Sequence, residues 1–579
     1  MLRSAAFGVI GAVASAAAFA QAPTQPASSV ATPTPVEQST LARDPFATGL
    51  LLKSDGALDP DLWKRADPVR VGALLDTAPS RPPTPSIGEA LRRTLLSSGD
   101  PPDGASASLG GRKLLALARA GFGEEARTIA SLSNAPRNDP WVGQALATAD
   151  LLDGAPNDAC KRNAALTTGR DAPFWVKLRV LCFALAGERD AADLSLTLLR
   201  EQGFLSDADQ AFLTALASGA GLKSPHAPQN ALHLAAVRQL GMPLSPSLLA
   251  VADGGTLKAV SRDASVGSAT RVAAAMRAAA MGVMSAAELT AAFGAIEVAD
   301  AGAARAREVA RGAPDDPMTD VLIYHSVRAM SAPEFLRDKA ALIAEALARA
   351  DSFPRAYAAA LLYGEDITAM EGALLKPEEA GRFALARMAA GDGDGAARWL
   401  FSMAGSGSAA SLGQDEAMTM VDLVNLLAIL DPISAKAVAE AANIALNSRA
   451  ARAPASEVRA EDQDLVARIV ESAFDAAVDE SAGQAALAAL AAAAVMDPAS
   501  PLGRVVVSQS LRAAGFNELR RRMDFEAAWR ARFRASAAAA AASNPAGAAP
   551  SQTLPAVSAQ PAAERRPTPR LKPKRARQG

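Results

Sequence analysis

The sequence is poor in the residues from which most catalytic and metal sites are built. It has 2 cysteines, 3 histidines and 3 tyrosines among 579 residues, and aromatic residues make up only 4% of the chain. Two cysteines without supporting histidines argue against a metal site. Half of the chain is apolar, and alanine supplies much of that share. We therefore expect helices in close contact, because alanine has the highest helix propensity and is depleted in strands.

A strong charge of one sign is also missing. The formal net charge is -2, which argues against nucleic-acid binding because domains that grip phosphates are normally basic. The charge is unevenly placed, however. The tail at 564–579 has one glutamate and seven bases: Arg565, Arg566, Arg570, Lys572, Lys574, Arg575 and Arg577. Its prolines prevent an amphipathic helix, so we expect a flexible strip drawn to anionic lipid, a cell-wall polymer or an acidic protein partner. The alternative is a solubilising tail without a partner.

The sequence offers no recognisable cofactor or metal motif. GSGSAASLG at 405–413 lacks the lysine and preceding strand of a phosphate loop, and GDGDG at 391–395 lacks the later acids of a calcium loop. We expect a linker and a turn at these places. His226, His233 and His325 are scattered without metal-binding spacing, and His325 is expected on a helix face with a hydrogen-bond partner. The sequence therefore predicts neither cofactor nor metal.

The first twenty residues have the layout of a secretory signal peptide. Arg3 precedes an apolar run, and Ala18-Phe19-Ala20 forms an A-x-A site, so cleavage is expected after Ala20. A membrane anchor is the alternative, but the run is short, rich in alanine and lacks a basic flank. No later segment is apolar enough to cross a bilayer. These features predict export into a bacterial periplasm.

The two cysteines, Cys160 and Cys182, lie close together in the sequence. In an oxidising compartment such a pair can form a disulfide, provided that the Cα atoms approach within about 7 Å. The alternative is two separate buried thiols that act as small apolar side chains. Both interpretations remain open from the sequence.

The domain boundaries follow from changes in composition. After the signal peptide we expect a disordered Pro/Thr/Ser linker at 21–45 and an extended lead-in at 46–85. An α-helical body at 86–534 and a disordered Ala/Pro/Ser linker at 535–563 then precede the tail. Strand-like alternation is absent from the body. Helix starts are predicted by four signals: Asp139-Pro140, Asp431-Pro432, Ser285 with Glu288, and Ser331 with Glu334. Helix ends are predicted at Gly121, Gly187, Gly203 and Gly391.

Three of these helix ends share a finer pattern. Ala126, Ala192 and Ala396 each follow the terminal glycine by five residues, where a small residue would open the next helix. The pattern resembles the turn inside tetratricopeptide repeats, and the spacing of the glycines is near multiples of their ~34-residue unit. A generic helical hairpin is the alternative. We predict an all-α, irregular solenoid of stacked hairpins, and the chain also resembles secreted bacterial helical-repeat proteins of unassigned function.

One stretch, VESAFDAAVDESAG at 470–483, contains a possible catalytic acid, Glu471. Its E-S-x-F context resembles the first motif of lytic transglycosylases, which cut peptidoglycan with a single glutamate of raised pKa. The expected proline after Asp475 is Ala476, and no later substrate motif follows. The alternative is a surface helix that ends near Val478, with a turn before the next helix.

Taken together, these features predict a non-enzymatic scaffold or protein-interaction component of the bacterial cell envelope, with unknown protein partners. A peptidoglycan-active enzyme that uses Glu471 is the alternative, and a chaperone-like subunit of an envelope machine is a third possibility. Such an enzyme would need Glu471 in a cleft, whereas a scaffold would allow it to lie on an exposed turn.

Overall fold

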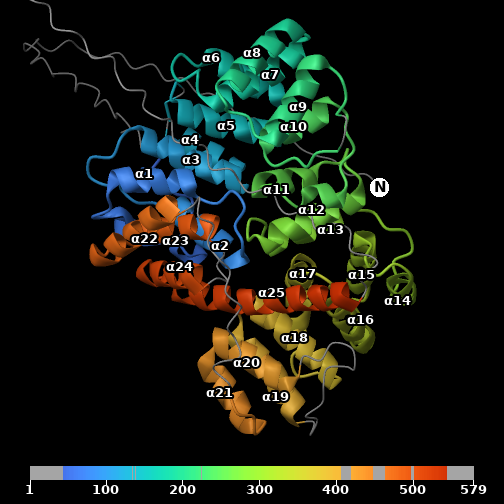
Figure 1. The fold of residues 1–579 in the computed structure, drawn as a ribbon. Helices are drawn as coiled ribbons and strands as arrows, with labels where there is room; N and C mark the ends of the chain where they lie inside the picture. The colour runs from blue at the N-terminus through green and yellow to red at the C-terminus, as the bar shows by residue number, and fades with distance from the viewer. Residues whose placement is uncertain are drawn as a thin grey trace, which may run out of the picture. The chain divides into compact units, whose positions relative to one another are not determined.

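The computed structural model describes residues 44–133, 135–136, 138–222, 225–373, 375–405, 419–446, 463–496 and 501–543. These ranges contain α-helices, short 3-10 helices and turns but no strand (Figure 1). The all-α prediction is confirmed. Within the same ranges, no helix combines the length and the apolar character that a bilayer crossing requires. The predicted signal peptide, the polybasic tail and most of the 405–413 linker lie outside the described residues.

Most neighbouring helices of the described residues are joined by short connections. The first thirteen α-helices are α1 (Pro68–Thr77), α2 (Pro85–Leu96), α3 (Ser108–Ala120), α4 (Gly123–Leu132), α5 (Pro140–Leu152), α6 (Pro156–Ala165), α7 (Pro173–Ala186), α8 (Arg189–Glu201), α9 (Asp207–Ser218), α10 (Ala231–Gln239), α11 (Gly254–Arg262), α12 (Ser268–Ala280) and α13 (Ala286–Gly294). The others that the structure describes are α14 (Ala303–Gly312), α15 (Pro317–Ala329), α16 (Leu336–Ala348), α17 (Phe353–Ala369), α18 (Pro377–Ala389), α19 (Gly393–Gly405), α20 (Met420–Leu430), α21 (Pro432–Ala441), α22 (Gln463–Val478), α23 (Ala482–Val495), α24 (Pro501–Ala513) and α25 (Asn517–Ser543). The described residues also contain four 3-10 helices. Two precede α1, namely η1 (Lys53–Asp55) and η2 (Pro60–Trp63), and two lie between α-helices, namely η3 (Pro246–Leu249) and η4 (Pro333–Phe335).

The predicted helix starts are confirmed at three of four places. Asp139 and Asp431 each accept hydrogen bonds from two backbone N–H groups of the following first turn. Ser285 and Glu288 form the reciprocal capping box of α13. The prediction at Ser331 is wrong, because η4 begins at Pro333 with Ala332 as its cap. Proline favours the first helical position, and this places Ser331 one residue too early to cap the helix.

The three glycine-to-alanine turns join the pairs α3/α4, α7/α8 and α18/α19. Their glycines adopt the left-handed conformation that residues with a side chain rarely adopt, with φ of 102° at Gly121, 78° at Gly187 and 83° at Gly391. The matching alanines, at 126, 192 and 396, are fully buried. A larger side chain there would push the paired helices apart. This confirms the predicted turn geometry.

Packing is mostly between consecutive helices. Neighbours such as α7 and α8, α11 and α12, and α22 and α23 contact each other along their length, and α3 also contacts α5. This sequential packing of helical pairs agrees with the predicted architecture. The core is one continuous apolar cluster in which alanines fill the spaces between leucines, as the composition predicts.

The lead-in at 46–85 differs from its predicted extended form, since it contains η1, η2 and α1. The missed signals are Asp59-Pro60 and Asp67-Pro68, which are helix starts of the same kind as Asp139-Pro140. Asp67 accepts hydrogen bonds from two backbone N–H groups of α1. The segment is anchored to the body by Lys113 of α3, which donates to two of its backbone carbonyl oxygens, each at 2.7 Å. Burial lowers the pKa of Lys113 to about 7.

The two ends of the helical body meet, which the sequence did not predict. Helix α23 packs against α1, α2 and η2, and α25 packs against α2, α17, α20 and α24 (Figure 1). Trp63 of η2 is buried against Gly483 of α23, where a Cβ atom would lie 2.4 Å from an indole ring carbon. Gln484 of α23 accepts a hydrogen bond of 2.9 Å from the backbone N–H of Asp67.

A buried carboxylate forms a second link between the ends. Glu526 of α25 is fully buried and accepts two hydrogen bonds from Ser86, at 3.1 Å from the backbone N–H and 2.8 Å from the hydroxyl. Ser86 lies in the first turn of α2, so the carboxylate satisfies an N–H that has no partner within the helix. Burial raises the pKa of Glu526.

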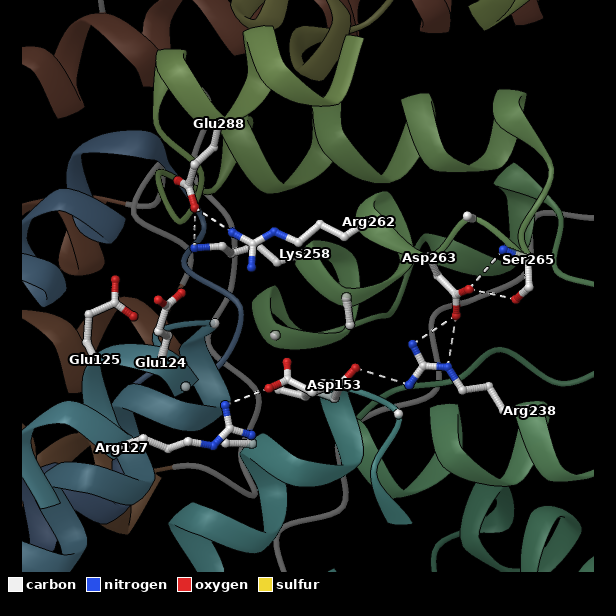
Figure 2. A pocket seen from close by; sticks show the side chains of 18 residues that line it. Glu124, Glu125, Arg127, Asp153, Arg238, Lys258, Arg262, Asp263, Ser265 and Glu288 are labelled. Atoms are coloured by element: carbon white, nitrogen blue, oxygen red, sulfur yellow. Dashed lines mark hydrogen bonds and ion pairs between the residues drawn. The ribbon is translucent and has the colours of Figure 1, made fainter. Parts of the chain in front are cut away.

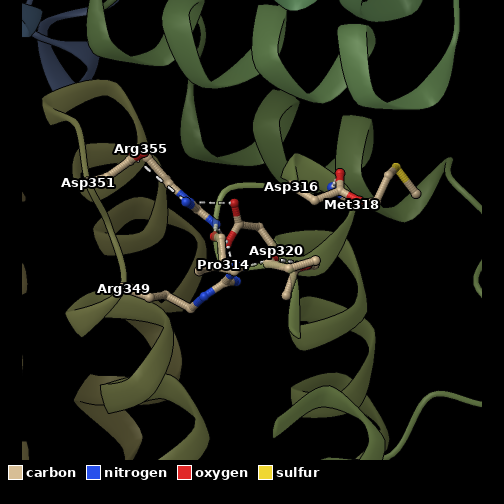
Figure 3. Close-up of polar contacts among 9 residues, drawn as sticks. Pro314, Asp316, Met318, Asp320, Arg349, Asp351 and Arg355 are labelled. Atoms are coloured by element: carbon tan, nitrogen blue, oxygen red, sulfur yellow. Dashed lines mark hydrogen bonds and ion pairs between the residues drawn. The ribbon is translucent and has the colours of Figure 1, made fainter. Parts of the chain in front are cut away.

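The middle of the chain has its own buried polar network, formed by α15, α16 and α17 (Figure 3). Arg349 donates to Asp320 at 2.9 Å, and Arg355 donates to the same carboxylate at 2.7 and 2.9 Å. Both guanidinium groups also donate to the backbone carbonyl of Pro314. Because one carboxylate and one carbonyl hold both buried charges, the network fixes how the three helices pack.

The C-terminal boundary of the body also differs from the prediction. Helix α25 continues to Ser543, beyond the expected end at residue 534. The reason is the run of alanines after 535, because alanine propagates a helix that packing has already started. Residues 544–579 lie outside the described part of the chain.

Candidate functional site

A cavity of about 840 Å³ lies between the α4/α5 hairpin and helices α10, α11 and α13 (Figure 2). The Gly121 turn forms part of its wall, because this turn brings the start of α4 close to α11. Most of the large side chains around it are charged. The acids are Glu124, Glu125, Asp153, Asp263 and Glu288, and the bases are Arg127, Arg238, Lys258 and Arg262.

Two arginines of the cavity are held at the end of α5. Arg127 of α4 pairs with Asp153 at 2.5 Å and with Asp150 at 3.3 Å. Arg238 of α10 donates to the backbone carbonyls of Leu151 and Leu152, at 3.0 and 3.1 Å. These carbonyls belong to the last turn of α5, where a positive charge is favourable. The guanidinium groups therefore fasten the hairpin and are not free for a ligand.

The opposite wall is organised around Glu288 of α13. Its carboxylate pairs with Lys258 and Arg262 of α11, each at 2.9 Å, and both bases point toward it in Figure 2. Burial opposes ionisation of this group, but Lys258 and the hydrogen bonds from Ser285 outweigh that effect and lower the pKa of Glu288. Glu288 is thus a permanent anion at neutral pH.

Asp263, on the α11–α12 turn, also has partners within the protein. The Ser265 hydroxyl donates to Asp263 at 2.6 Å, and Arg238 donates to the same carboxylate at 3.0 Å. These contacts lower the pKa of Asp263 although burial opposes them. Of the lining side chains, only Glu124 and Glu125 have no ion pair within the described part of the chain. The uncompensated charge of the cavity is therefore negative.

This arrangement suits binding better than catalysis. A general acid or base must exchange its proton near neutral pH, whereas Asp263 and Glu288 are stabilised as anions. The serine in the cavity has a carboxylate as its partner and no histidine beside it. Among the described residues, no cluster of His, Cys, Asp and Glu side chains could hold a metal ion. The cavity can accept hydrogen-bond donors or a positive charge near Glu124 and Glu125.

Glu471 is not among the residues that line this cavity. It is on the surface of α22, with 65% of its side chain exposed, and accepts from Arg70 of α1 at 3.3 Å. Arg70 also pairs with Asp475, one turn further along the helix. The alternative interpretation expected a helix end near Val478 and a turn, and α22 does end at Val478. Glu480 has φ of 53° in the turn that follows.

The last glycine of the 470–483 stretch has a structural role. Gly483, in the first turn of α23, has no side chain, and this gives space to the Trp63 ring. Phe474 of the same stretch is 69% exposed. Arg65 of the lead-in donates to the backbone carbonyl of Asp479, and its ion pair with Glu480 spans 3.2 Å. The lead-in is thus connected to α22 and α23 through Gly483 and through the acids Glu471, Asp475 and Glu480.

The remaining candidate residues have structural partners. Cys160 of α6 and Cys182 of α7 are joined by a disulfide, with their Cα atoms 5.6 Å apart. A pair at this distance is compatible with an oxidising compartment. His325 contacts the backbone carbonyl of Ile296 at 2.9 Å, as expected for a helix-face histidine. The GDGDG segment is a turn in which Asp392 accepts from the N–H of Gly395 and pairs with Arg387.

His233 is the histidine whose position the sequence did not indicate. It is buried and stacks on Phe212, and one ring nitrogen lies 3.1 Å from Asp209. Its other nitrogen accepts from the backbone N–H of Gln229, so it has no position free for a substrate. Despite burial, His233 and Lys177 lower the pKa of Asp209 well below its ordinary value.

The fold and the cavity define a class: an all-helical chain of consecutively packed helical pairs with a charged cavity. Comparison with the models of protein families, with curated proteins and with solved structures found no match for this chain. The cavity itself could not be found from the sequence. Glu288 was recognised only as a capping residue, and its pairing with Lys258 and Arg262 depends on how α11 and α13 pack.

Proposed function

We propose that this chain is a non-enzymatic scaffold or protein-interaction component of the bacterial cell envelope. The observation that carries the proposal is the lining of the cavity, in which the bases are bound to acids or to helix carbonyls. Such a lining is polar, and among its described charged side chains Glu124 and Glu125 are the ones without an ion pair to offer another molecule a negative charge. The signal-peptide layout of residues 1–20 supports location in the periplasm.

The position of Glu471 also favours a scaffold over an enzyme. A catalytic glutamate of a glycosidase needs an apolar surrounding that keeps its proton near neutral pH. Glu471 is instead exposed and paired with an arginine. This placement on an exposed helix surface, away from the residues that line the cavity, is the one that the scaffold hypothesis allows.

In-cell crosslinking with mass spectrometry tests the proposal. The full chain is compared with a chain truncated after Ala563, which removes the polybasic tail. We expect one defined envelope protein to be recovered, and its loss on truncation would assign the contact to the tail. Recovery of peptidoglycan fragments without a protein partner would contradict the scaffold.

Zymography of the purified protein on peptidoglycan, with Glu471→Gln as the matched control, tests the enzymatic alternative. We expect no clearing from either protein. Clearing by the natural protein that disappears in the variant would replace the scaffold with the enzyme.

A further inference from the structure

Helix α22 carries an exposed apolar seam that its own fold does not use. Ala467, Val470, Phe474 and Ala477 are all exposed and follow one another at spacings of three, four and three residues. This is the spacing with which a helix presents a continuous seam to a second helix. Phe474 is 69% exposed, and Val478, one turn further on, is 63% exposed. A solvent-exposed phenylalanine between valines marks an interaction surface better than scattered single residues do.

The opposite face of α22 is already packed. Ile469, Ser472 and Ala476 are buried, and α22 contacts α23 and α24 within the body. Helix α24 exposes two apolar residues of its own, Leu502 and Val505. The sixteen residues that precede α22, 447–462, contain a single large apolar side chain, Val458. Their composition gives them little with which to cover the seam.

Charge along the seam indicates what kind of helix fits it. From residue 464 to residue 480 there are five acids and one arginine: Asp464, Arg468, Glu471, Asp475, Asp479 and Glu480. Arg65 and Arg70 of the lead-in compensate part of this charge through ion pairs with Glu480, Glu471 and Asp475. The surface remains negative. Charges that flank a helical seam select the partner, because like charges across it repel.

We propose that the seam of α22 is the docking site for a helix of a partner protein, whose apolar stripe is flanked by lysines or arginines. A second copy of this chain fits poorly, because it would bring the same carboxylates together. The inference rests on the proposed scaffold function and names the chemistry of one of its contacts. Phe474 is the central anchor, since aromatic residues at the centre of an interface contribute most of the binding energy.

The test uses the full chain and two labelled synthetic helices in fluorescence anisotropy. The first peptide has leucines at the three- and four-residue spacing of the seam and lysines elsewhere, and the second has glutamates in place of the lysines. We expect the lysine peptide to bind, with an affinity that falls as salt is raised. The glutamate peptide should not bind. Phe474→Ala should weaken binding roughly tenfold, and Phe474→Asp should abolish it, as for loss of a central interface residue.

The matched control is Ile433→Asp, which changes another exposed apolar residue on α21, 83% exposed and outside the seam. This variant should bind like the natural protein, and circular dichroism should show that all variants keep their helix content. Equal binding by Phe474→Asp and the natural protein would overturn the proposal, as would equal binding of both peptides. A dimer of the full chain that Phe474→Asp dissociates would also overturn it and would assign the seam to a second copy. If the lysine peptide does not bind while crosslinking still recovers a partner protein, the proposed scaffold function is retained and the proposed docking site on α22 is wrong.

Discussion

The contact between Trp63 and Gly483 makes the joining of the two chain ends testable by substitution. Trp63 is 1% exposed, so Trp63→Ala leaves a cavity in the core and should cost about 3–5 kcal/mol of unfolding free energy. Gly483→Ala should also destabilise. A Cβ at this position would lie 2.4 and 2.7 Å from ring carbons of Trp63 and 2.8 Å from the carbonyl oxygen of Leu62. Overpacking of this kind costs about 1–3 kcal/mol.

The experiment is decided by the sign of the change in unfolding free energy that Gly483→Ala causes. Glycine to alanine in an ordinary exposed helix position stabilises by up to about 1 kcal/mol. Gly364 in α17 serves as the comparison, because it is only partly buried and a Cβ there meets nothing within 4 Å. Gly364→Ala should therefore raise the urea midpoint, whereas Gly483→Ala should lower it. In the Trp63→Ala background the ring is gone, so Gly483→Ala should cost less than it does alone.

Urea unfolding followed by far-UV circular dichroism measures these differences, and hydrogen exchange locates them. In Trp63→Ala, amides of α23 should exchange faster together with those of α1, although the two helices are far apart in the sequence. A stabilising Gly483→Ala, or strictly additive effects of the two substitutions, would refute the contact.

Two further predictions concern buried groups of the body. Burial raises the pKa of Asp253, the N-terminal cap of α11, from an ordinary value of 3.8 to about 7. The folded protein then keeps this proton while the unfolded chain releases it, so stability should fall between about pH 4 and pH 7, by up to about 4 kcal/mol, and stay level above. Asp253→Asn should flatten this slope in thermal melts at a series of pH values, and unchanged slopes would contradict the assignment. For Cys160 and Cys182, alkylation of the non-reduced protein followed by mass spectrometry should find both protected. Replacing both with alanine should cost about 3 kcal/mol, as expected for a closed loop of this length, and labelled thiols in the natural protein would contradict the disulfide.

Local structure was predictable wherever a short residue pattern determines it. The caps at Asp139, Asp431 and Ser285 formed as expected because each depends on two to four neighbouring residues. The same pattern at Asp67-Pro68 was present but overlooked, because the lead-in lacks a long apolar period. The Ser331 prediction failed by one residue, since Pro333 fixed the helix start.

Contacts between distant segments could not be predicted in this way. Nothing in the sequence near Gly483 indicates that its missing side chain makes room for Trp63. The negative cavity could not be predicted for the same reason, because its acids and bases come from four different helices, the end of α5 and the α11–α12 turn. The spacing of the apolar seam residues of α22 could be predicted from the sequence, since it is visible in VESAFDAAV. The exposure of the seam could not be predicted, because periodicity alone does not tell which face of a helix is buried.

The pairing of Ser86 with Glu526 has a consequence for the order in which the chain folds. The two residues are separated by 440 positions, so almost the whole body is synthesised before the carboxylate that completes the first turn of α2 exists. Contacts of such long range form late, because the entropy of closing the loop must be overcome first. Until then the backbone N–H of Ser86 lacks its carboxylate partner, although Thr84 already caps α2, and the surface that α23 and α25 will cover is open to water. The first helices of the body therefore reach their final packing only after α25, the last helix that the structure describes, has been synthesised and has docked.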